Sequence, residues 1–261
     1  MENNLSQSNV NTPWHFITPL LFLASTMLLM LMALYFIESG QLGKPAVLIG
    51  LFGPAIMAVL FSYIGGGWHQ ARQLLKQYIV YRVSLGYYAI ALLLMPTLIY
   101  ITMLFTDFTG LAYYENWFRS VSMGQLIFIP LISIGEELGW RGYLQPLFRQ
   151  KYSLAVASTF VGCLWALWHI TGYYFNTGVV EGLPFYLFFI WVVGASLIMG
   201  YLYEKTQSVL LAVIFHSSVN FSLNIFLINP EFSGSVLPFS ILTLLVCCIG
   251  LAFVRYHAKT R

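Results

Sequence analysis

Charged residues are scarce in this sequence. Only 8% of its 261 residues are Asp, Glu, Lys or Arg, whereas 59% are hydrophobic and the mean hydropathy is +0.78. A soluble domain carries about 25% charged residues, so this composition excludes an ordinary soluble domain and indicates an integral membrane protein. We expect the lipid bilayer as a partner and no nucleic acid.

Other absences exclude particular chemistries. The three cysteines, Cys163, Cys247 and Cys248, all lie in apolar runs, so neither a disulfide framework nor a CxxC metal site is predicted. Asp107 is the single aspartate, which excludes a catalytic pair of aspartates. No histidine begins a His-Glu-x-x-His sequence, and no Gly-x-Ser-x-Gly is present, so the usual zinc helix and the usual serine-nucleophile turn are excluded.

Long apolar runs make up most of the chain. A membrane-spanning helix needs roughly 17–25 mostly apolar residues. We predict eight of them, near 14–37, 46–65, 83–105, 123–148, 153–175, 184–204, 207–228 and 236–255. Because no Lys or Arg precedes the first run, we expect a retained helix rather than a cleaved signal peptide. The prediction is an all-α polytopic membrane protein that forms one integral membrane domain over residues 1–261.

The segment between the second and third predicted helices is amphipathic. In a helical arrangement its apolar and polar side chains fall on two sides, Leu74, Leu75, Ile79 and Val80 against Arg72, Lys76 and Gln77. This pattern predicts an amphipathic helix that lies in the membrane interface. An ordinary loop helix packed on the bundle is the alternative.

Basic residues predict the orientation of the chain. Nine of them fall on one side of the eight-helix arrangement: Arg72, Lys76, Arg82, Arg149, Lys151, Lys205, Arg255, Lys259 and Arg261. Only Lys44 and Arg119 fall on the other side. Since cytoplasmic loops are enriched in Lys and Arg, both termini are predicted to be cytoplasmic and the 176–183 and 229–235 loops external. The short loops favour a bacterial plasma membrane.

Six polar residues lie well inside the predicted spans, on three helices: Glu136, Glu137, Arg141, His169, His216 and Asn220. Glu137 and Arg141 are four residues apart and can form an ion pair on one helix face. Glu136 projects about 100° away from Glu137, so we expect it to be unpaired and to face a cavity. His216 and Asn220 also share a face, and Trp165 lies one turn before His169.

The depths of these residues in their helices predict one polar cluster that opens towards the cytoplasm. The alternative is a purely structural role. Gly135 and Gly139 form a GxxxG pair that predicts close helix packing whatever the chemistry, and a single His or Asn often links membrane helices. Intramembrane ionisable groups are nevertheless functional by default, and Glu136 has no partner in the sequence pattern. A functional site is therefore the preferred interpretation.

The chemical groups of these polar residues are those that hydrolysis of a peptide bond requires. Glu136 can activate water as the base, and His169 can orient that water or return the proton. His216 and Asn220 can stabilise the oxyanion. Glu136, His169 and His216 would also make a zinc site with water as the fourth ligand. The residues alone therefore leave carboxylate-activated and zinc-bound water as alternatives.

Three ordered motifs resemble a known family. EELGWR (Glu136, Glu137, Arg141) matches EExxxR, and HSSVN (His216, Asn220) matches HxxxN. WALWH matches FxxxH, with Trp165 in place of Phe. The family is the CPBP (Abi, or CAAX-protease-like) group of intramembrane endopeptidases.

The resemblance implies an eight-helix bundle and peptide-bond cleavage with Glu136 as the water activator, His169 assisting, and His216 and Asn220 at the oxyanion. Glu137, Arg141 and Trp165 would orient the site. Of the family's two labels, metalloprotease and glutamate protease, we favour the second, with no cofactor.

The resemblance covers both prenylated CAAX tails and bacterial peptides as substrates, so we expect a peptide or protein tail. Two interpretations without proteolysis compete with it. The first is a bacteriocin-immunity or scaffold protein that retains the cluster for packing. The second is a transporter with a Glu/His proton relay, which the absence of paired broken helices disfavours.

Overall fold

A computed structural model describes residues 14–175 and 179–260 of the chain. This part is all-α, with a single isolated antiparallel bridge between Phe118 and Phe226. The helices are α1 Trp14–Glu38, α2 Val47–Leu51, α3 Gly53–Lys76, α4 Leu85–Phe108, α5 Met123–Glu137, α6 Gln145–Arg149, α7 Leu154–Trp168, α8 Ile170–Tyr174, α9 Phe185–Thr206, α10 Val209–Ile225, α11 Pro230–Ser233 and α12 Leu237–Lys259. Short 3₁₀ turns occupy Lys44–Ala46 and Gln77–Ile79, and a π-helix, Leu138–Leu144, joins α5 to α6.

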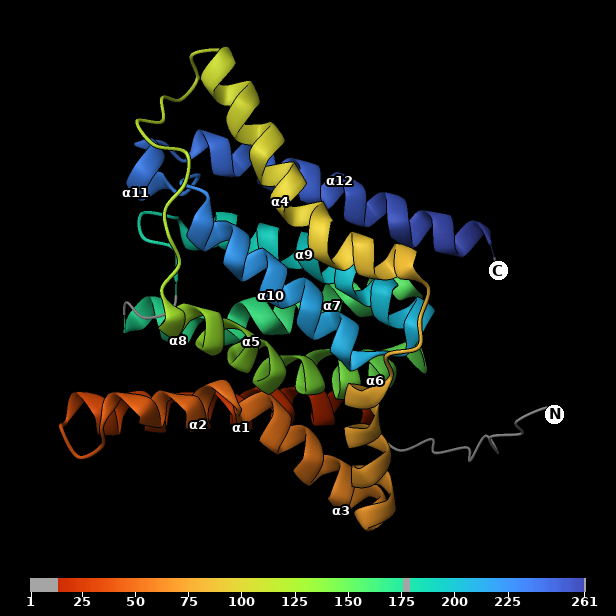
Figure 1. Ribbon diagram of the computed structural model, residues 1–261. Coiled ribbons are helices and arrows are strands. Elements are labelled where there is room, and N and C mark those ends of the chain that lie inside the picture. The colour runs from red at the N-terminus through yellow and green to blue at the C-terminus, as the bar shows by residue number, and fades with distance from the viewer. Residues whose placement is uncertain (1–13, 176–178, 261) are drawn as a thin grey trace.

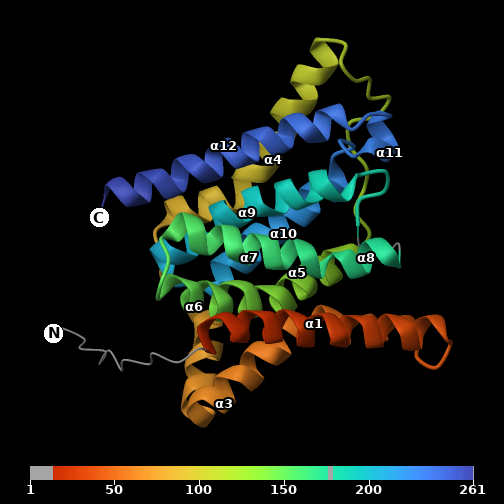
Figure 2. The same ribbon diagram turned by 180° about the vertical axis from the view of Figure 1, so that it is seen from behind.

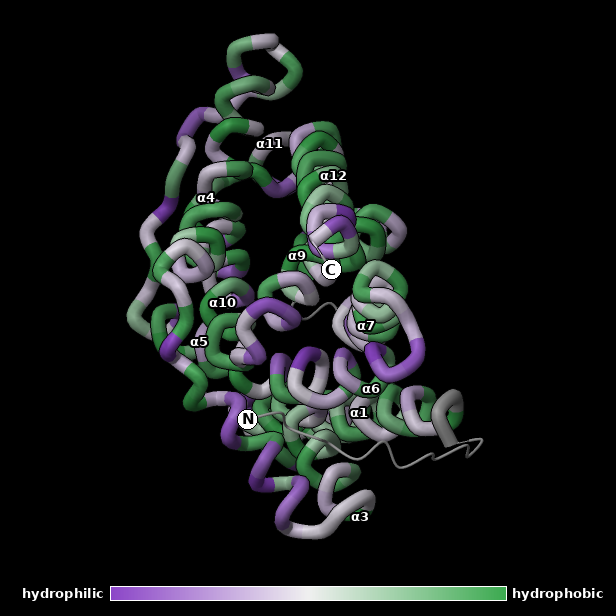
Figure 3. Tube along the Cα trace, turned by 90° about the vertical axis from the view of Figure 1, so that its right-hand side faces the viewer, coloured by the Kyte–Doolittle hydropathy of each residue, from purple (hydrophilic) through white to green (hydrophobic). Residues whose placement is uncertain are grey.

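The long helices run back and forth between two ends of the molecule (Figure 1). We call the end with the α3–α4, α6–α7 and α9–α10 connections the basic end, and the other, with α8 and α11, the loop end. Figures 1 and 2 both show α1–α3 on one side of α5 and α7, and α12 with α4 on the other. Helix α9 packs against both α7 and α12 at the centre. Figure 3 looks onto the basic end, where hydrophilic segments gather.

The eight-span prediction is not confirmed. Among the described residues, five helices are long and apolar enough to cross a membrane, and a bent pair, Lys44–Leu51 with Gly53–Ile79, makes a sixth. The shorter apolar helix α10 has 17 residues. The remaining predicted span, 123–148, is helical but interrupted, because the α-helix ends at Glu137 and a π-helix with a buried Arg141 follows. The protein is thus an all-α polytopic membrane protein with five or six candidate spans.

The predicted amphipathic helix is the second half of α3. It follows a kink at Gly66 and Gly67, where Gly67 has a φ of +64°, a backbone conformation that favours glycine. Leu74 is buried against the bundle, whereas Leu75 and Ile79 are exposed. Its apolar side chains therefore divide between the bundle and the outside, and its place in the membrane interface stays a prediction.

Helix α5 carries the glutamates towards the centre of the bundle. A reciprocal capping box between Ser122 and Gln125 fixes its first turn. Farther along, Gly135 and Gly139 allow backbone contact with α2 and α3: a Cβ at Gly135 would lie 2.8 Å from the Leu51 carbonyl oxygen, and one at Gly139 2.7 Å from that of Pro54. The GxxxG pair thus sets the position of Glu136 by allowing α5 and the π-helix to approach their neighbours.

We expect Gly139→Ala to destabilise the protein by about 1–3 kcal/mol, because the added methyl group overlaps backbone that cannot rotate away. Gly124→Ala in the preceding helix, α5, is the matched control, since its Cβ would meet nothing closer than Ser122 Oγ at 3.8 Å. Thermal unfolding in detergent measures both. Equal melting temperatures for the two variants would contradict the close packing.

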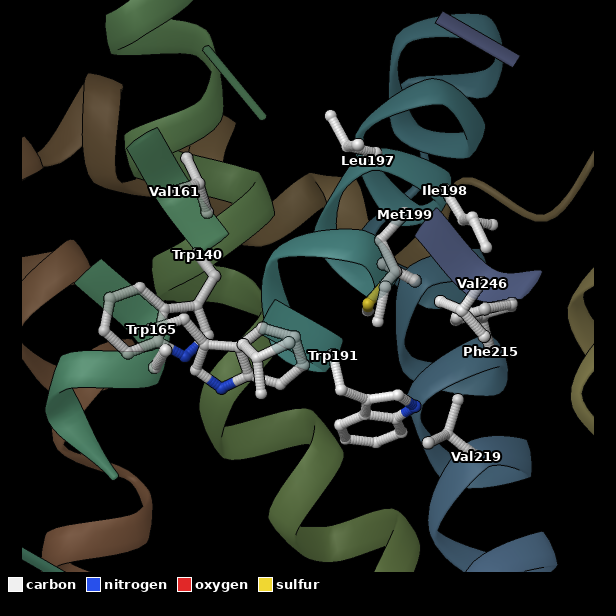
Figure 4. Close-up of a cluster of buried hydrophobic side chains, with 14 of the residues drawn as sticks. Trp140, Val161, Trp165, Trp191, Leu197, Ile198, Met199, Phe215, Val219 and Val246 are labelled. Atoms are coloured by element: carbon white, nitrogen blue, oxygen red, sulfur yellow. The ribbon is translucent and has the colours of Figure 1, made fainter. Parts of the chain in front are cut away.

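Aromatic side chains fill the interior around this helix (Figure 4). Trp140 and Trp168 are almost fully buried, and their ring centroids are 6.1 Å apart in an edge-to-face arrangement. Trp165 and Trp191, from α7 and α9, belong to the same buried cluster. Large rigid rings fill the space between the helices, so they hold the helices at fixed separations around the glutamates.

Candidate active site

One cavity brings together side chains from three separate segments of the chain. Glu136 of α5, His169 at the end of α7, and His216 and Asn220 of α10 all line a cavity of about 550 Å³. The predicted cluster is therefore present, although its members lie up to 84 positions apart in sequence (220 − 136). Glu137 and Arg141 lie behind the wall of the cavity and do not line it.

Glu137 forms a buried three-residue network. Its two oxygens accept hydrogen bonds from Arg141 Nη1 at 3.2 and 3.0 Å, and both side chains are fully buried. The Oε1 atom also lies 2.7 Å from His216 Nδ1. An ionised carboxylate only accepts, so Nδ1 is the donor and the opposite nitrogen, Nε2, is left for the cavity. The predicted ion pair between Glu137 and Arg141 is therefore present. The contact between Glu137 and His216 was not predicted from the spacing in the sequence.

The expectation that Glu136 has no partner is wrong. Its Oε2 atom accepts a hydrogen bond of 2.7 Å from the indole Nε1 of Trp165. The Arg141 guanidinium lies 4.5 Å from the centre of the same indole ring. The signal in the sequence was Trp in place of Phe in the FxxxH motif, because only the indole supplies an N–H donor. One oxygen of Glu136 is thereby fixed, and the other remains for the cavity.

His169 is held by its own helix. Its Nδ1 lies 2.9 Å from the Trp165 carbonyl oxygen, which can only accept, so this nitrogen carries the hydrogen. Trp168 and Phe188 pack on the ring with centroid distances of 5.0 and 5.1 Å. The ring therefore presents Nε2 as an acceptor. Both histidines are fixed through Nδ1 and offer Nε2.

Asn224 is a site residue that the sequence interpretation missed. It lies one turn beyond Asn220, lines the cavity, and donates from its amide to the Asn220 carbonyl at 2.9 Å. Its Oδ1 accepts from Arg119 at 3.1 Å and from Gln125 at 2.9 Å, and Arg119 also donates to its backbone carbonyl. The available signal was the i,i+4 repeat of Asn in HSSVNFSLN. This network joins α10 to α5 at the loop end.

The cavity does not open towards the basic end. Beyond the glutamates and histidines, its lining continues to Arg119, Glu181 and Glu231, which are exposed at the loop end. The expectation of a cluster open towards the predicted cytoplasmic side is therefore wrong. The positions of these residues along their helices indicated that they lie at a similar depth in the membrane. They could not show which end of the bundle is closed by packed side chains.

The residues suggested for zinc do not fit a metal site in this arrangement. Within residues 14–175 and 179–260, no group of three or more His, Cys, Asp or Glu side chains is placed to hold one metal ion. We therefore assign no step to zinc.

Comparison with known proteins agrees with the motifs. Residues 117–222 match the family model described as Type II CAAX prenyl endopeptidase Rce1-like. A CAAX prenyl protease 2 from Methanococcus maripaludis is 28% identical over 165 residues, which cover 57% of this chain and 60% of the relative. Lysostaphin resistance protein A from Staphylococcus haemolyticus is 27% identical over 135 residues, covering 48% and 35%.

The chain thus spans less than two thirds of the length of either relative. The matched region nevertheless contains all three motifs, in order, and every polar side chain that they place around the cavity. Neither match supports the bacteriocin-immunity interpretation. On these grounds, the part of the chain that carries the site, residues 117–222, matches the Rce1-like family of type II CAAX prenyl endopeptidases, within the CPBP group.

Proposed function

We propose that the protein is an intramembrane endopeptidase that hydrolyses a peptide or protein tail with water activated by Glu136. The observation that carries this proposal is the division of the paired glutamates. Glu137 is enclosed with Arg141 and His216, whereas Glu136 lines the cavity beside two histidines whose Nε2 atoms are unused by these contacts. A carboxylate retained for packing alone has no need of such neighbours.

Attack begins at Glu136. Trp165 holds Oε2, so the other oxygen takes a proton from water as the hydroxide forms a bond to the carbonyl carbon of the substrate. His169 Nε2 accepts a hydrogen bond from the same water and aligns it. Both acceptors are held by partners on rigid helices, which keeps the reacting geometry fixed.

The tetrahedral intermediate places negative charge on the former carbonyl oxygen. The Asn220 amide donates to that oxygen, and His216 donates through Nε2 when its ring carries both hydrogens. The carbon–nitrogen bond then breaks, and the proton on Glu136 passes to the leaving amine. The carboxylate is regenerated and the proton count balances.

Hydrolysis of a quenched peptide library by the purified, detergent-solubilised protein tests this function. We expect cleavage products with one added water by mass spectrometry, formed equally with and without a strong zinc chelator. Activity that is lost under chelation and restored by zinc would contradict water activation by Glu136 alone. Cleavage that is unchanged in Glu136→Gln would contradict the assignment altogether.

Trp165 gives the mechanism a separate test. Trp165→Phe restores the aromatic residue usual in the motif but removes the N–H donor to Glu136. A hydrogen bond to a charged group contributes about 1.5–3 kcal/mol, so we expect kcat to fall roughly tenfold or more while KM stays unchanged.

Trp140→Phe is the matched control for this variant. Trp140 is fully buried beside Trp168, does not line the cavity, and its indole N–H has no hydrogen-bond partner in the described part of the chain. It should lower thermal stability without lowering kcat. An identical kcat for Trp165→Phe and the wild type would show that the indole N–H does not act on Glu136.

A further inference from the structure

The mouth of the cavity is built from connections at the loop end. Arg119 comes from the α4–α5 connection, Glu181 from the segment before α9, and Glu231 from α11. All three are exposed, whereas Glu136 and His216 at the other extreme of the cavity are only 2% and 5% exposed. The cavity therefore runs from buried reactive groups to solvent at this end.

Contacts between helices close the basic end. Arg149 binds Glu204 with nitrogen–oxygen distances of 2.8 and 3.0 Å. The Tyr203 hydroxyl donates to Gln77 at 2.8 Å. Trp140 and Leu144, which lie in the chain between Glu137 and Arg149, are fully buried. No residue beyond Met199 on α9, or before His216 on α10, lines the cavity.

The charges at the two ends of the molecule indicate on which side of the membrane the mouth of the cavity lies. Among the described residues, the basic end carries eight Lys and Arg residues and the loop end carries two, Lys44 and Arg119. Five acidic residues lie at or near the loop end, Glu38, Asp107, Glu115, Glu181 and Glu231. Retention of Lys and Arg in the cytoplasm orients short-looped membrane proteins, so the basic end is cytoplasmic and the loop end external.

We infer that the cavity opens to the extracytoplasmic side and takes an apolar peptide segment from that side, with a cationic group of the peptide held at Glu181 and Glu231. The inference on the substrate rests on the proposed peptidase function. The inference on the side to which the cavity opens does not depend on that function. A tail that remains in the cytoplasm would face the closed end of the protein and could not reach Glu136.

The lining fits such a segment. Apolar side chains form the walls between mouth and reactive groups, among them Met30, Leu34, Leu51, Phe188 and Trp191. An extended segment is required, because the peptide bonds of a helix are shielded by their own hydrogen bonds. A cavity of about 550 Å³ has the size of a small-ligand site, so it accommodates a few residues rather than a folded domain.

The charges at the mouth favour a cation. The Arg119 guanidinium is engaged with Asn224 and lies 5.1 Å from the centre of the Phe232 ring. The two carboxyl groups, Glu181 and Glu231, are adjacent to each other. Partial burial, and then the charge of Glu181, raise the pKa of Glu231 above its ordinary value, while Arg119 acts in the opposite direction. A Lys, Arg or amino-terminal ammonium group relieves the repulsion within this pair.

Cysteine labelling in intact cells tests the side of the opening, independently of any activity. Cys163, Cys247 and Cys248 are first replaced by Ala, and Val180→Cys at the mouth is compared with Gln150→Cys at the basic end. A membrane-impermeant maleimide should label Val180→Cys in intact cells, and Gln150→Cys only after permeabilisation. The reverse pattern, or labelling of both in intact cells, would overturn the inference. The inference would also be overturned if Val180→Cys were labelled only after permeabilisation and not in intact cells.

Matched peptides test the cationic preference. Peptides that differ only in a terminal Lys, Gln or Glu should be cleaved with KM lowest for Lys, and the Glu181→Gln/Glu231→Gln variant should lose this preference. An exposed ion pair contributes up to about 1 kcal/mol, so we expect an increase in KM for the Lys peptide of about fivefold per pair, with kcat unchanged.

Asp107→Asn removes an acidic residue of the same end that does not line the cavity, and should change nothing. Acidification should raise KM for the Lys peptide but not for the Gln peptide, beginning at a higher pH than an ordinary carboxyl would give. Equal KM values for the three peptides with the wild type would overturn the cationic preference. Absence of cleavage by the wild type would instead count against the peptidase function, and the labelling result would stand.

Discussion

Glu136→Gln should abolish most of the peptidase activity while leaving the fold intact. A positioned general base contributes about 10²–10⁴-fold to the rate, so we expect kcat/KM to fall by that factor. The amide has nearly the same shape, and its carbonyl oxygen can still accept the 2.7 Å hydrogen bond from Trp165. It cannot take a proton from water. Peptide cleavage and thermal unfolding, measured on the same preparation, check both parts.

The comparison with the wild type separates catalysis from packing. A structural role for the cluster predicts unchanged cleavage in Glu136→Gln, because the buried volume and the bond to Trp165 are kept. A melting temperature that falls together with the activity would show that the ionised carboxylate is needed for folding, and would contradict its assignment to water alone.

Glu137→Gln should damage folding and activity together. The substitution removes the counter-charge of Arg141, which is fully buried and has two further nitrogens, Nε and Nη2, without a hydrogen-bond partner among the described residues. Leaving a buried charge unpaired costs about 3–5 kcal/mol. His216 loses its ionised acceptor at the same time, so the ring no longer has a fixed orientation. We expect a large fall in melting temperature and little remaining cleavage.

A second substitution distinguishes these two effects. Removing the charge of Arg141 as well removes the cost of burying that charge without a partner. The double variant Glu137→Gln/Arg141→Met should therefore regain much of the melting temperature but not the activity, because His216 still lacks its carboxylate. Recovery of cleavage in the double variant would show that Glu137 only neutralises the charge of Arg141 and is not needed to orient His216.

The sequence by itself determined the class of protein and the members of the site. Low charge and long apolar runs require a membrane protein, because a backbone in hydrocarbon must satisfy its hydrogen bonds within helices. The spacing of Glu137 and Arg141 fixed their ion pair, since residues four apart face the same side of a helix. The three ordered motifs indicated the family, which the match over residues 117–222 confirmed. The catalytic roles of Glu136, His169, His216 and Asn220 stay predictions.

Only the tertiary structure decided how these residues are connected and which way the cavity opens. The bond from Trp165 to Glu136 and the contact of His216 with Glu137 join helices separated by 29 and 79 positions, and no local periodicity encodes such a pairing. The π-helix that interrupts the predicted span 123–148, and the close approach of Gly135 and Gly139 to α2 and α3, are likewise seen only in the assembled bundle. The direction of the cavity depends on which end the packed side chains fill, and that is a property of the assembled bundle rather than of any one helix.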